Sequence, residues 1–326
     1  MNVPPKEAIR VTPAALRTLV AALLERVGVS EADRTLLADL LVQNDLRGVF
    51  SHGSRQVATY ARDIRDGKLN PRPAVQVVND SPATILIDGD GGLGYFPSHR
   101  AARALVPKAR DVGVAVAVTR NHGHFGAAGL YSRIAVEASF FGYVTSGHQL
   151  QLEAGQPILD AAGGSPHSFG VPAGDQAPLI LDFGAIHDVG SGSPRGKEIF
   201  DLAPGLVFRH LGLAAVCQSI GGFLGGVPFD ERRATRRFAG ANQGSFMVFV
   251  DISRFMPLSD FQREMDEYVA RIATLQPLPG YDQALLPGAI ERQRLQAWAT
   301  EGVPVGPEHQ RRLSGVAAEL GVGTPW

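Results

Sequence analysis

The stretch that decides the fold is Val112-Gly-Val-Ala-Val-Ala-Val-Thr119, followed by Arg120-Asn-His-Gly-His-Phe-Gly-Ala-Ala-Gly-Leu-Tyr131. The first part is small and branched apolar, which predicts a buried strand, and the alanine-rich residues from Gly126 to about Ser139 predict a helix. His122 and His124 therefore lie where a strand ends and a helix begins. In α/β proteins ligands bind there, and the helix N-terminus offers N–H groups to an anion. The alternative is a helix entry whose histidines only form local hydrogen bonds.

Composition narrows the class of protein. The 326 residues include 31 basic and 32 acidic side chains, a net charge of −1 that gives no reason to expect nucleic acid or an anionic membrane as partner. Hydrophobic residues make up 44%, enough for a sizeable core. The single Cys217 cannot form an internal disulfide and lies in an apolar stretch, so we expect a core residue and a reducing compartment. The N-terminus lacks the apolar core of a signal peptide, and no apolar run approaches the ~20 residues of a membrane span, which predicts a cytoplasmic protein.

The order of elements predicts an α/β layer architecture between helical ends. Ser30-Glu-Ala-Asp33 is a capping signature for a helix running to about Arg47, and a second helix from about Ser54 ends at Gly67. We expect an N-terminal helical part (1–75), an α/β cofactor and substrate domain (76–250), and a C-terminal helical part (251–326) that packs with the first. The remaining predicted elements are strands at 83–87, 112–119, 179–181 and 246–251, helices at 97–111 and 126–139, and a last helix near 309–320.

A second candidate site is Asp45-Leu-Arg-Gly-Val-Phe-Ser-His-Gly53, in the turn between the first two long helices. Imidazole titrates near ~6.5, so His52 is suited to donate or accept a proton near neutral pH. Ser51 and the N–H groups of the following helix are suited to hold a substrate carboxylate. The alternative is an interhelical turn with Ser51 as a cap and His52 on the surface.

Two glycine-rich loops and a metal site are further candidates for function. Asp88-Gly-Asp-Gly-Gly-Leu-Gly94 departs from the dinucleotide pattern, so a tight turn between strand and helix is favoured. The loop 163–170 places His167 and Ser168 where they would contact a phosphate or ribose, with Asp182 at the end of the next strand, although the bare sequence favours an ordinary loop. His122-x-His124 has a metal-ligand spacing that His52 or Asp45 would extend, but no histidine-carboxylate cluster of recognised spacing accompanies it, and we predict no metal.

Several short motifs recur in order over most of the chain and together resemble one family. They are Asp45-x-Arg47-Gly48, Ser51-His52-Gly53, Tyr60, Gly67-Lys-Leu-Asn-Pro71, Ile87-Asp-Gly89, Gly113 to Val118, His124-Phe125-Gly126, Val171-Pro-Ala-Gly174, Leu181-Asp182, Leu286-Pro-Gly288 and Glu301-Gly-Val-Pro304. The chain resembles the type-2 malate/L-lactate dehydrogenase family, which includes sulfolactate and ureidoglycolate dehydrogenases and a cyclic-imine reductase. The paired Ser-His-Gly and His-Phe-Gly motifs are the most specific part of the resemblance.

The resemblance implies a three-layer fold around a mixed sheet, distinct from the Rossmann arrangement, and a homodimer. It implies hydride transfer between NAD or NADP and a small 2-oxo, 2-hydroxy or cyclic imino acid. His124 would be the proton donor, and Ser51 and His52 would line the substrate and nicotinamide pocket. A positioned imidazole suits this chemistry, because reducing a carbonyl requires a proton at oxygen as hydride reaches carbon. The predicted cofactor-binding residues are Phe125, Gly126, His122, His167, Ser168 and Asp182, and the predicted substrate-binding residues are Arg47, Arg55 and Gln56.

The chain also departs from the family pattern. Many members carry an arginine five residues after the motif serine, where this chain has Gln56, with Arg55 one place early. The segment Asp188 to Gly226 is shorter than the family's cofactor segment, which motivates a second hypothesis. It is an enzyme of the same fold without hydride transfer, a lyase, hydratase or isomerase that uses His52 and His124 as acid and base. A non-catalytic binding protein is the third reading, and the two retained histidine motifs favour it least.

Overall fold

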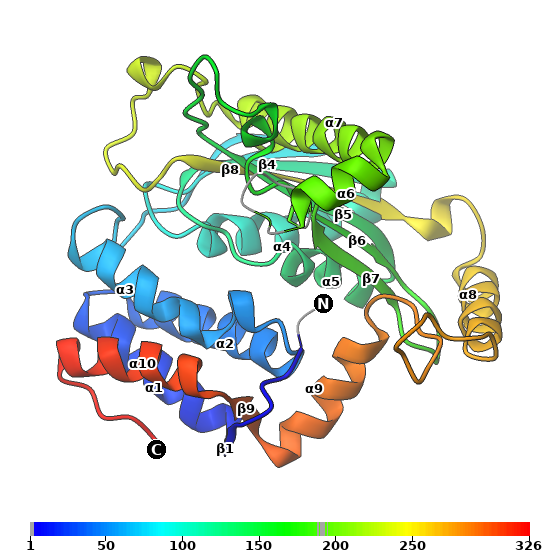
Figure 1. Ribbon diagram of the computed structural model, residues 1–326. Helices are drawn as coiled ribbons and strands as arrows, with labels where there is room; N and C mark the ends of the chain where they lie inside the picture. Colours follow the sequence, from blue (N-terminus) through cyan, green and yellow to red (C-terminus); the bar gives the residue numbers. More distant parts are fainter. Residues whose placement is uncertain (1–2, 188, 190–192, 194) are drawn as a thin grey trace. The chain divides into compact units, whose positions relative to one another are not determined.

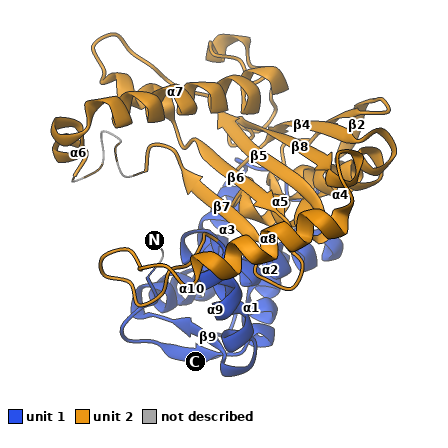
Figure 2. Ribbon diagram, turned by 90° about the vertical axis from the view of Figure 1, so that its right-hand side faces the viewer, with its two compact units in different colours: residues 1–73, 288–326 blue, residues 74–287 orange. Residues whose placement is uncertain are grey.

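The computed structural model describes residues 3–187, 189, 193 and 195–326, so Asp188, where the shortened segment begins, lies outside the described residues. Two compact units make up the chain (Figure 2). Unit 1 comprises residues 1–73 and 288–326, and unit 2 comprises residues 74–287. The predicted C-terminal part, 251–326, is thus divided between the two units.

Unit 1 is a helical unit formed by both ends of the chain. Ser30 caps the second helix, because its Oγ accepts a hydrogen bond from the Asp33 N–H at 3.2 Å, which confirms the predicted helix start. The predicted second long helix begins later than expected, since residues 54–56 form a 3-10 turn before the helix proper. The elements are α1 (Pro13–Arg26), α2 (Glu31–Leu46), α3 (Val57–Arg65), α9 (Ala289–Glu301) and α10 (Pro307–Leu320), with β1 (Ile9–Val11) paired antiparallel to β9 (Val303–Val305).

Unit 2 contains a seven-stranded sheet in the order β2-β3-β4-β8-β5-β6-β7. Only β3 and β4 pair in parallel, so the sheet is mixed. Because β8 runs antiparallel to both β4 and β5, and β6 to both β5 and β7, the carboxyl ends of β3, β4, β5 and β7 share one edge. The strands are β2 (Gln76–Asp80), β3 (Thr84–Asp88), β4 (Val114–His122), β5 (Phe140–His148), β6 (Pro166–Val171), β7 (Leu179–Gly184) and β8 (Gln243–Asp251).

Helices cover both faces of this sheet (Figure 1). Helices α4 (Tyr95–Val112) and α5 (Gly129–Glu137) lie on one face, where a Cβ at Gly142 of β5 would lie 2.6 Å from the Ala135 side chain of α5. Helix α7 (Pro204–Gly221) lies on the other face, where the Cys217 thiol lies beside Thr145 of β5. Gly142 and Thr145 point to opposite faces because side chains alternate along a strand. The three layers around a mixed sheet confirm the predicted fold class.

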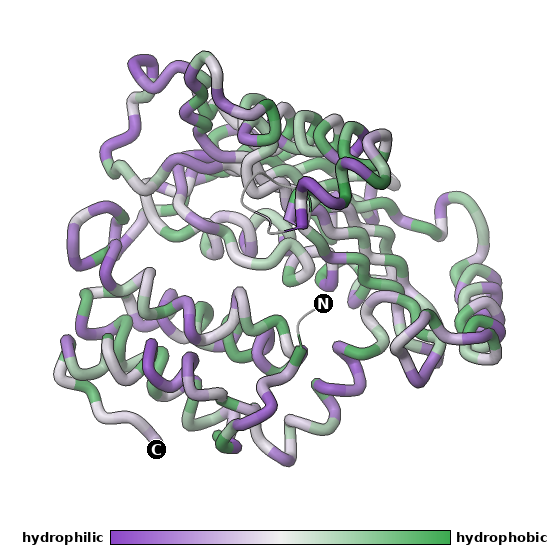
Figure 3. The backbone as a smooth tube through the Cα atoms, viewed as in Figure 1, coloured by the Kyte–Doolittle hydropathy of each residue, from purple (hydrophilic) through white to green (hydrophobic). Residues whose placement is uncertain are grey.

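One expectation about hydropathy was wrong. Helix α7 and its following turn, Pro204–Gly225, are long and apolar enough to cross a membrane, by length and composition only. The sequence reading missed this run because Arg209, His210 and Gln218 interrupt it, although Arg209 is its single formal charge. In unit 2 one face of α7 packs on the sheet, where the Gln218 amide bonds both the N–H and the carbonyl of His148. Figure 3 shows how apolar this helix is along its length.

Several elements of unit 2 differ from the prediction. Strands β2, β5 and β6 were not predicted, and the predicted helix 126–139 is shorter, because α5 begins only at Gly129 after the turn at Gly126. Burial raises the pKa of the Cys217 thiol to about 11, as expected of a core cysteine and not of a nucleophile. Two further helices are α6 (Gly196–Leu202) and α8 (Leu258–Ile272).

Candidate active site

The turn after β4 is held by the glycine-rich loop that precedes α4. The Gly91 N–H donates to the Asn121 carbonyl at 2.9 Å, the Gly123 N–H to the Gly92 carbonyl at 2.8 Å, and the Gly94 N–H to the His124 carbonyl at 3.1 Å. A Cβ at Gly94 would lie 2.5 Å from His122 Nδ1, so only glycine fits this close approach. The loop is therefore the tight strand–helix turn that the sequence favours.

His122 is part of the protein interior. Its Nδ1 lies 2.7 Å from the Gly123 carbonyl, which can only accept, so Nδ1 carries the proton and Nε2 accepts from the Thr119 hydroxyl at 2.7 Å. The Thr119 hydroxyl also lies 2.6 Å from Ser245 Oγ, which in turn lies 3.2 Å from Ser98 Oγ. Burial lowers the pKa of His122 to about 4 and keeps the ring neutral. The His122 side chain thus forms only local hydrogen bonds among the described residues, which is the alternative to a ligand-binding role.

His124 differs from His122 because its ring is only partly buried. The residues around it are anchored: Phe125 is buried, stacks on Tyr131 at 5.4 Å, and its carbonyl accepts from the Tyr131 hydroxyl. Gly126 has φ of 84°, and a Cβ there would lie 2.5 Å from the Tyr95 ring. His124 is therefore a half-exposed imidazole on a fixed backbone, which is the geometry that a proton donor requires.

The other predicted cofactor residues occupy two strands of the sheet. His167 is fully buried on β6, with Nδ1 2.9 Å from the Tyr143 hydroxyl, and Ser168 is fully buried with Oγ 2.7 Å from Ser132 Oγ. Asp182 of β7 is exposed, and its carboxylate accepts from the Gly129 N–H at 3.0 Å. That carboxylate already lies at the start of α5, where the helix N-terminus was expected to offer N–H groups to an anion. Cofactor binding by these residues stays a prediction.

In unit 1 the Ser51-His52 turn is rigidly held. Ser51 Oγ lies 2.9 Å from His52 Nδ1, the Asn44 amide donates to the His52 carbonyl at 2.9 Å, and the Gln56 amide donates to the Ser51 carbonyl. Both motif side chains are half-buried. Arg55, the neighbour of Gln56, has a buried Nε with no hydrogen-bond partner among the described residues. The Gln56 amide therefore stabilises the backbone of the Ser51-His52 turn.

Arg47, the third predicted substrate-binding residue, lies just after α2. Its Nη1 donates to the Gln43 carbonyl at 2.9 Å and lies 3.3 Å from the Gln43 side-chain oxygen. The guanidinium thus makes hydrogen bonds to its own helix.

Asp45 lies buried beneath the same turn. Its Oδ2 accepts from the Ser54 N–H at 2.9 Å, and Ser54 Oγ lies 2.9 Å from Nε2 of His309 on α10. Burial raises the pKa of Asp45 to about 7, even though the hydrogen bonds from Ser54 and the charge of Arg55 oppose the shift. This buried polar link between α2 and α10 was not predicted from the sequence, since Ser54 and His309 are far apart along the chain.

We expect Asp45→Asn to stabilise the protein at alkaline pH. The folded pKa of about 7 lies above the unfolded value of 3.8, so stability falls as pH rises from 4 to 7 and then levels off. Above pH 7 ionisation of buried Asp45 lowers the free energy of unfolding by on the order of 4 kcal/mol. Because asparagine does not ionise, the variant avoids this loss. Urea unfolding at pH 4.5 and pH 8 measures this. The free energy of unfolding of Asp45→Asn should exceed that of the wild type by more at pH 8 than at pH 4.5. An equal difference at both pH values would contradict the raised pKa of Asp45.

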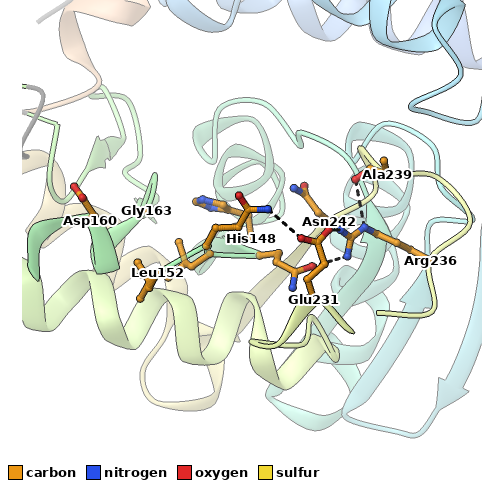
Figure 4. A pocket seen from close by; sticks show the side chains of 11 residues that line it. His148, Leu152, Asp160, Gly163, Glu231, Arg236, Ala239 and Asn242 are labelled. Carbon is orange, nitrogen blue, oxygen red and sulfur yellow. Dashed lines mark hydrogen bonds and ion pairs between the residues drawn. The ribbon is translucent and has the colours of Figure 1, made fainter. Parts of the chain in front are cut away.

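Two adjoining cavities lie in unit 2. The larger, about 470 Å³, is lined by His148 at the end of β5 and by Glu231, Arg236 and Asn242 near the start of β8 (Figure 4). The smaller, about 310 Å³, shares Arg236 and Asn242 and adds Asn121, three residues before His124. Sequence reasoning missed His148 and Arg236. The only signal for His148 was a polar residue ending a run that did not look like a strand.

The smaller cavity carries excess positive charge. Arg120, Arg236 and Arg237 line it together with one carboxylate, Asp88, which lies 3.0 Å from Arg120 Nε and accepts from the Asn121 amide at 2.8 Å. Glu231 also pairs with Arg236 at 2.7 Å, so three guanidinium groups meet two carboxylates, and the remaining positive charge suits an anionic ligand. The guanidinium donors of this cavity therefore suit an anionic group such as a cofactor diphosphate.

His148 and the His122–His124 turn belong to the same edge and face of the sheet. His148 and His122 both pair with Gln243 of β8, from opposite sides. His148 lies on the same face as Gly142, which faces α5, because the two residues are an even number of positions apart. His122 packs against the N-terminal end of α4 on that face as well. Strands lie about 4.8 Å apart, so β4 and β5 are separated by roughly 10 Å. His122 and His148 therefore lie about two strand spacings apart on that face.

Comparison with known proteins assigns the family. The family model described as malate/L-lactate dehydrogenase matches residues 11–187 and 205–314. The chain belongs to the malate/L-lactate dehydrogenase family. The part left unmatched between the two ranges falls within the segment that departs from the family pattern.

Named relatives of this malate/L-lactate dehydrogenase family member are similar over nearly their whole length. The malate dehydrogenase of Pyrococcus horikoshii is 27% identical over 96% of both chains, and the L-sulfolactate dehydrogenase of Methanocaldococcus jannaschii is 28% identical over 94% of this chain and 96% of the relative. The solved malate dehydrogenase from Pyrococcus horikoshii superimposes with a TM-score of 0.84 at 25% identity, covering 99% of each chain. The family predicted from the sequence is confirmed, and membership indicates an enzyme with dehydrogenase activity.

Proposed function

We propose that the protein is an NAD- or NADP-dependent oxidoreductase that transfers a hydride between the cofactor and a small 2-oxo, 2-hydroxy or cyclic imino acid. The observation that carries the proposal is the half-exposed His124 on a fixed backbone, in a chain of this family whose unit 2 also contains two polar cavities. The relatives' names support the substrate class, since they denote dehydrogenases of small hydroxy acids.

The proposed chemistry divides between cofactor and protein. A bound nicotinamide supplies or accepts the hydride. His124 gives a proton to the substrate oxygen or nitrogen during reduction and takes it back during oxidation. Arg120 and Arg237 in the smaller cavity would hold the cofactor phosphates, because they provide its positive charge. Ser51 and His52 remain the proposed substrate contacts of unit 1.

Cofactor titration tests the proposal. Purified protein is titrated with NADH and NADPH by calorimetry, with energy transfer from tryptophan to nicotinamide as a second readout. Binding of one cofactor at micromolar concentration, followed by oxidation of that cofactor with 2-oxo or cyclic imino acids, is the expected result. Absence of binding at millimolar cofactor would contradict the proposal. Turnover without cofactor that depends on His52 and His124 would instead favour a lyase, hydratase or isomerase.

We also propose that the protein is a homodimer. In unit 2 helix α7 exposes apolar side chains such as Phe208 and Val216, the 3-10 turn after it exposes Leu224, and α6 adds Phe200 and Leu202. An apolar surface of this kind marks an interaction site more often than a solvated face. Light scattering coupled to size-exclusion chromatography should give twice the 34.7 kDa chain mass, and a monomer would exclude the proposal.

A further inference from the structure

Two buried side chains hold the backbone on either side of His124. The Gly123 carbonyl accepts a hydrogen bond from His122 Nδ1 at 2.7 Å, and the Phe125 carbonyl accepts one from the Tyr131 hydroxyl. The Tyr131 ring also stacks on the Phe125 ring, with centroids 5.4 Å apart. The residues immediately before and after His124 are thus each tied to a side chain of the protein interior.

The glycine-rich loop before α4 closes over the same segment. The His124 carbonyl, which lies between the two others in sequence, accepts from the Gly94 N–H at 3.1 Å. Three consecutive peptide planes are therefore held, and they set the direction in which the His124 side chain leaves the backbone. A Cβ at Gly94 would lie 2.5 Å from His122 Nδ1 and 2.6 Å from the Gly123 carbonyl oxygen, so the loop packs tightly against this bond.

A row of hydroxyl groups fixes the tautomer of His122. Its Nε2 accepts from the Thr119 hydroxyl at 2.7 Å, so the Thr119 oxygen must accept from Ser245 at 2.6 Å, and Ser245 from Ser98 at 3.2 Å. All four side chains are fully buried. Burial also lowers the pKa of His122 to about 4, which keeps the ring neutral. The proton that binds the Gly123 carbonyl therefore stays on Nδ1 throughout the neutral pH range.

Four elements of unit 2 contribute to this arrangement (Figure 1). His122 belongs to β4 and Tyr131 to α5, while the hydroxyl row adds Ser245 of β8 and Ser98 of α4. Because the anchors come from separate elements, the His124 segment moves only if the sheet and both helices move with it. A group held in this way keeps the precise orientation that catalysis requires.

We propose that His122 and Tyr131 are positioning residues, which hold the His124 imidazole in the orientation that proton transfer requires. The inference rests on the proposed function and adds two residues to it. Both side chains are fully buried, so they act through His124 and not by contact with a substrate. A displacement of about 1 Å at a reacting group is sufficient to lower the rate by about 100-fold.

The test measures kcat and KM of His122→Gln and Tyr131→Phe with the best substrate of the 2-oxo acid panel. Glutamine places its amide near the position of Nε2 and leaves the Gly123 carbonyl without its donor, whereas phenylalanine removes only the hydroxyl. Each substitution should lower kcat about 10- to 100-fold with little change in KM. His122→Asn should recover part of the loss, because its amide nitrogen reaches the position of Nδ1.

A second measurement separates positioning from general damage to the protein. The ring is absent in His124→Ala, so adding His122→Gln or Tyr131→Phe to that variant should lower the remaining kcat by less than about 2-fold. Losses that persist in full in the His124→Ala background, or a kcat within about 2-fold of the wild type in both single variants, would overturn the proposal. Thermal unfolding checks the fold of each variant. Tyr131→Phe, which loses one oxygen atom, carries the test alone if His122→Gln does not fold.

Matched controls make the same chemical changes elsewhere in unit 2. His210 Nδ1 lies 2.9 Å from the Leu206 carbonyl of its own helix, so His210→Gln breaks the same kind of bond away from the His124 segment. Tyr268 of α8 is 55% exposed, so Tyr268→Phe removes a hydroxyl at the surface. Both controls should keep the kcat of the wild type.

Failure of the proposed function can be separated from failure of this inference. If no substrate is turned over, nuclear magnetic resonance of protein labelled at histidine observes the His124 ring directly, and loss of the signal in His124→Ala assigns it. The wild type should give one sharp His124 signal, which His122→Gln and Tyr131→Phe should shift or broaden and His210→Gln should not. An unchanged His124 signal in both variants contradicts the proposal whether or not the protein turns over a substrate.

Discussion

Replacing His124 by alanine should lower kcat by about 10²- to 10⁴-fold while leaving the fold and cofactor binding intact. The imidazole is half-exposed, and its neighbours anchor the backbone without its ring: Gly94 bonds the His124 carbonyl, and Phe125 is packed against Tyr131. Removing the ring therefore removes a proton donor and little packing. The effect should appear in kcat with small change in KM, because the proton moves only in the transition state.

Steady-state kinetics with the best substrate of the 2-oxo acid panel measure this loss. His210→Ala is the matched control, because that histidine lies on α7 and its ring bonds only the carbonyl of Leu206 on its own helix. Its kcat should equal that of the wild type. Turnover of His124→Ala within a few-fold of the wild type would remove His124 from the mechanism, and loss of the thermal transition would move it to a structural role.

Replacing Gly53 by alanine should destabilise the protein by about 3 kcal/mol. A Cβ at Gly53 would lie 1.8 Å from Asp45 Oδ1 and 2.6 Å from Asp45 Cγ, and Asp45 is fully buried beneath the turn. The backbone of Gly53 is extended, with φ of −88°, so steric overlap and not conformational strain causes the loss. Since Ser51 and His52 immediately precede this residue, kcat/KM should fall together with stability.

Urea unfolding measures the change, and Gly315→Ala is the control. A Cβ at Gly315 in α10 would have Arg62 Nη2 as its nearest neighbour, at 3.9 Å, so that substitution should be neutral or stabilising by up to about 1 kcal/mol. If the overlap with Asp45 is the cause, Asp45→Ala and Gly53→Ala should be far from additive, because the first makes room for the second. Additive losses would show that Gly53 is needed for another reason.

Local patterns were sufficient to predict the parts of the fold that depend on neighbours in sequence. The Ser30 cap, the strand through Val112–Thr119 and the glycine turn before α4 follow from residue types at short spacing. Strand β5 was missed because Gly142, Thr145 and Gly147 interrupt its apolar pattern, although β8 on one side and β6 on the other hold it in the sheet. Pairing over long distances overrides weak strand propensity.

The candidate site was predictable in part for the same reason. His124 follows from its motif, but the burial of His122 depends on a register shift between Thr119 and His122 that no pattern reveals. The larger cavity was missed because it joins residues near 148 and 236, which only the β5–β8 pairing brings together.

The position of β8 between β4 and β5 has a consequence for biosynthesis. Almost one hundred residues separate the end of β5 from the start of β8, yet β8 supplies the hydrogen-bond partners of both. On the ribosome the chain emerges from its N-terminus, so the two strands that carry the histidines have no common partner until the last third is made. Such non-local closure is slow to form. A nascent chain that has passed residue 148 is therefore still without its ligand-binding edge, and that edge matures only after β8 has emerged.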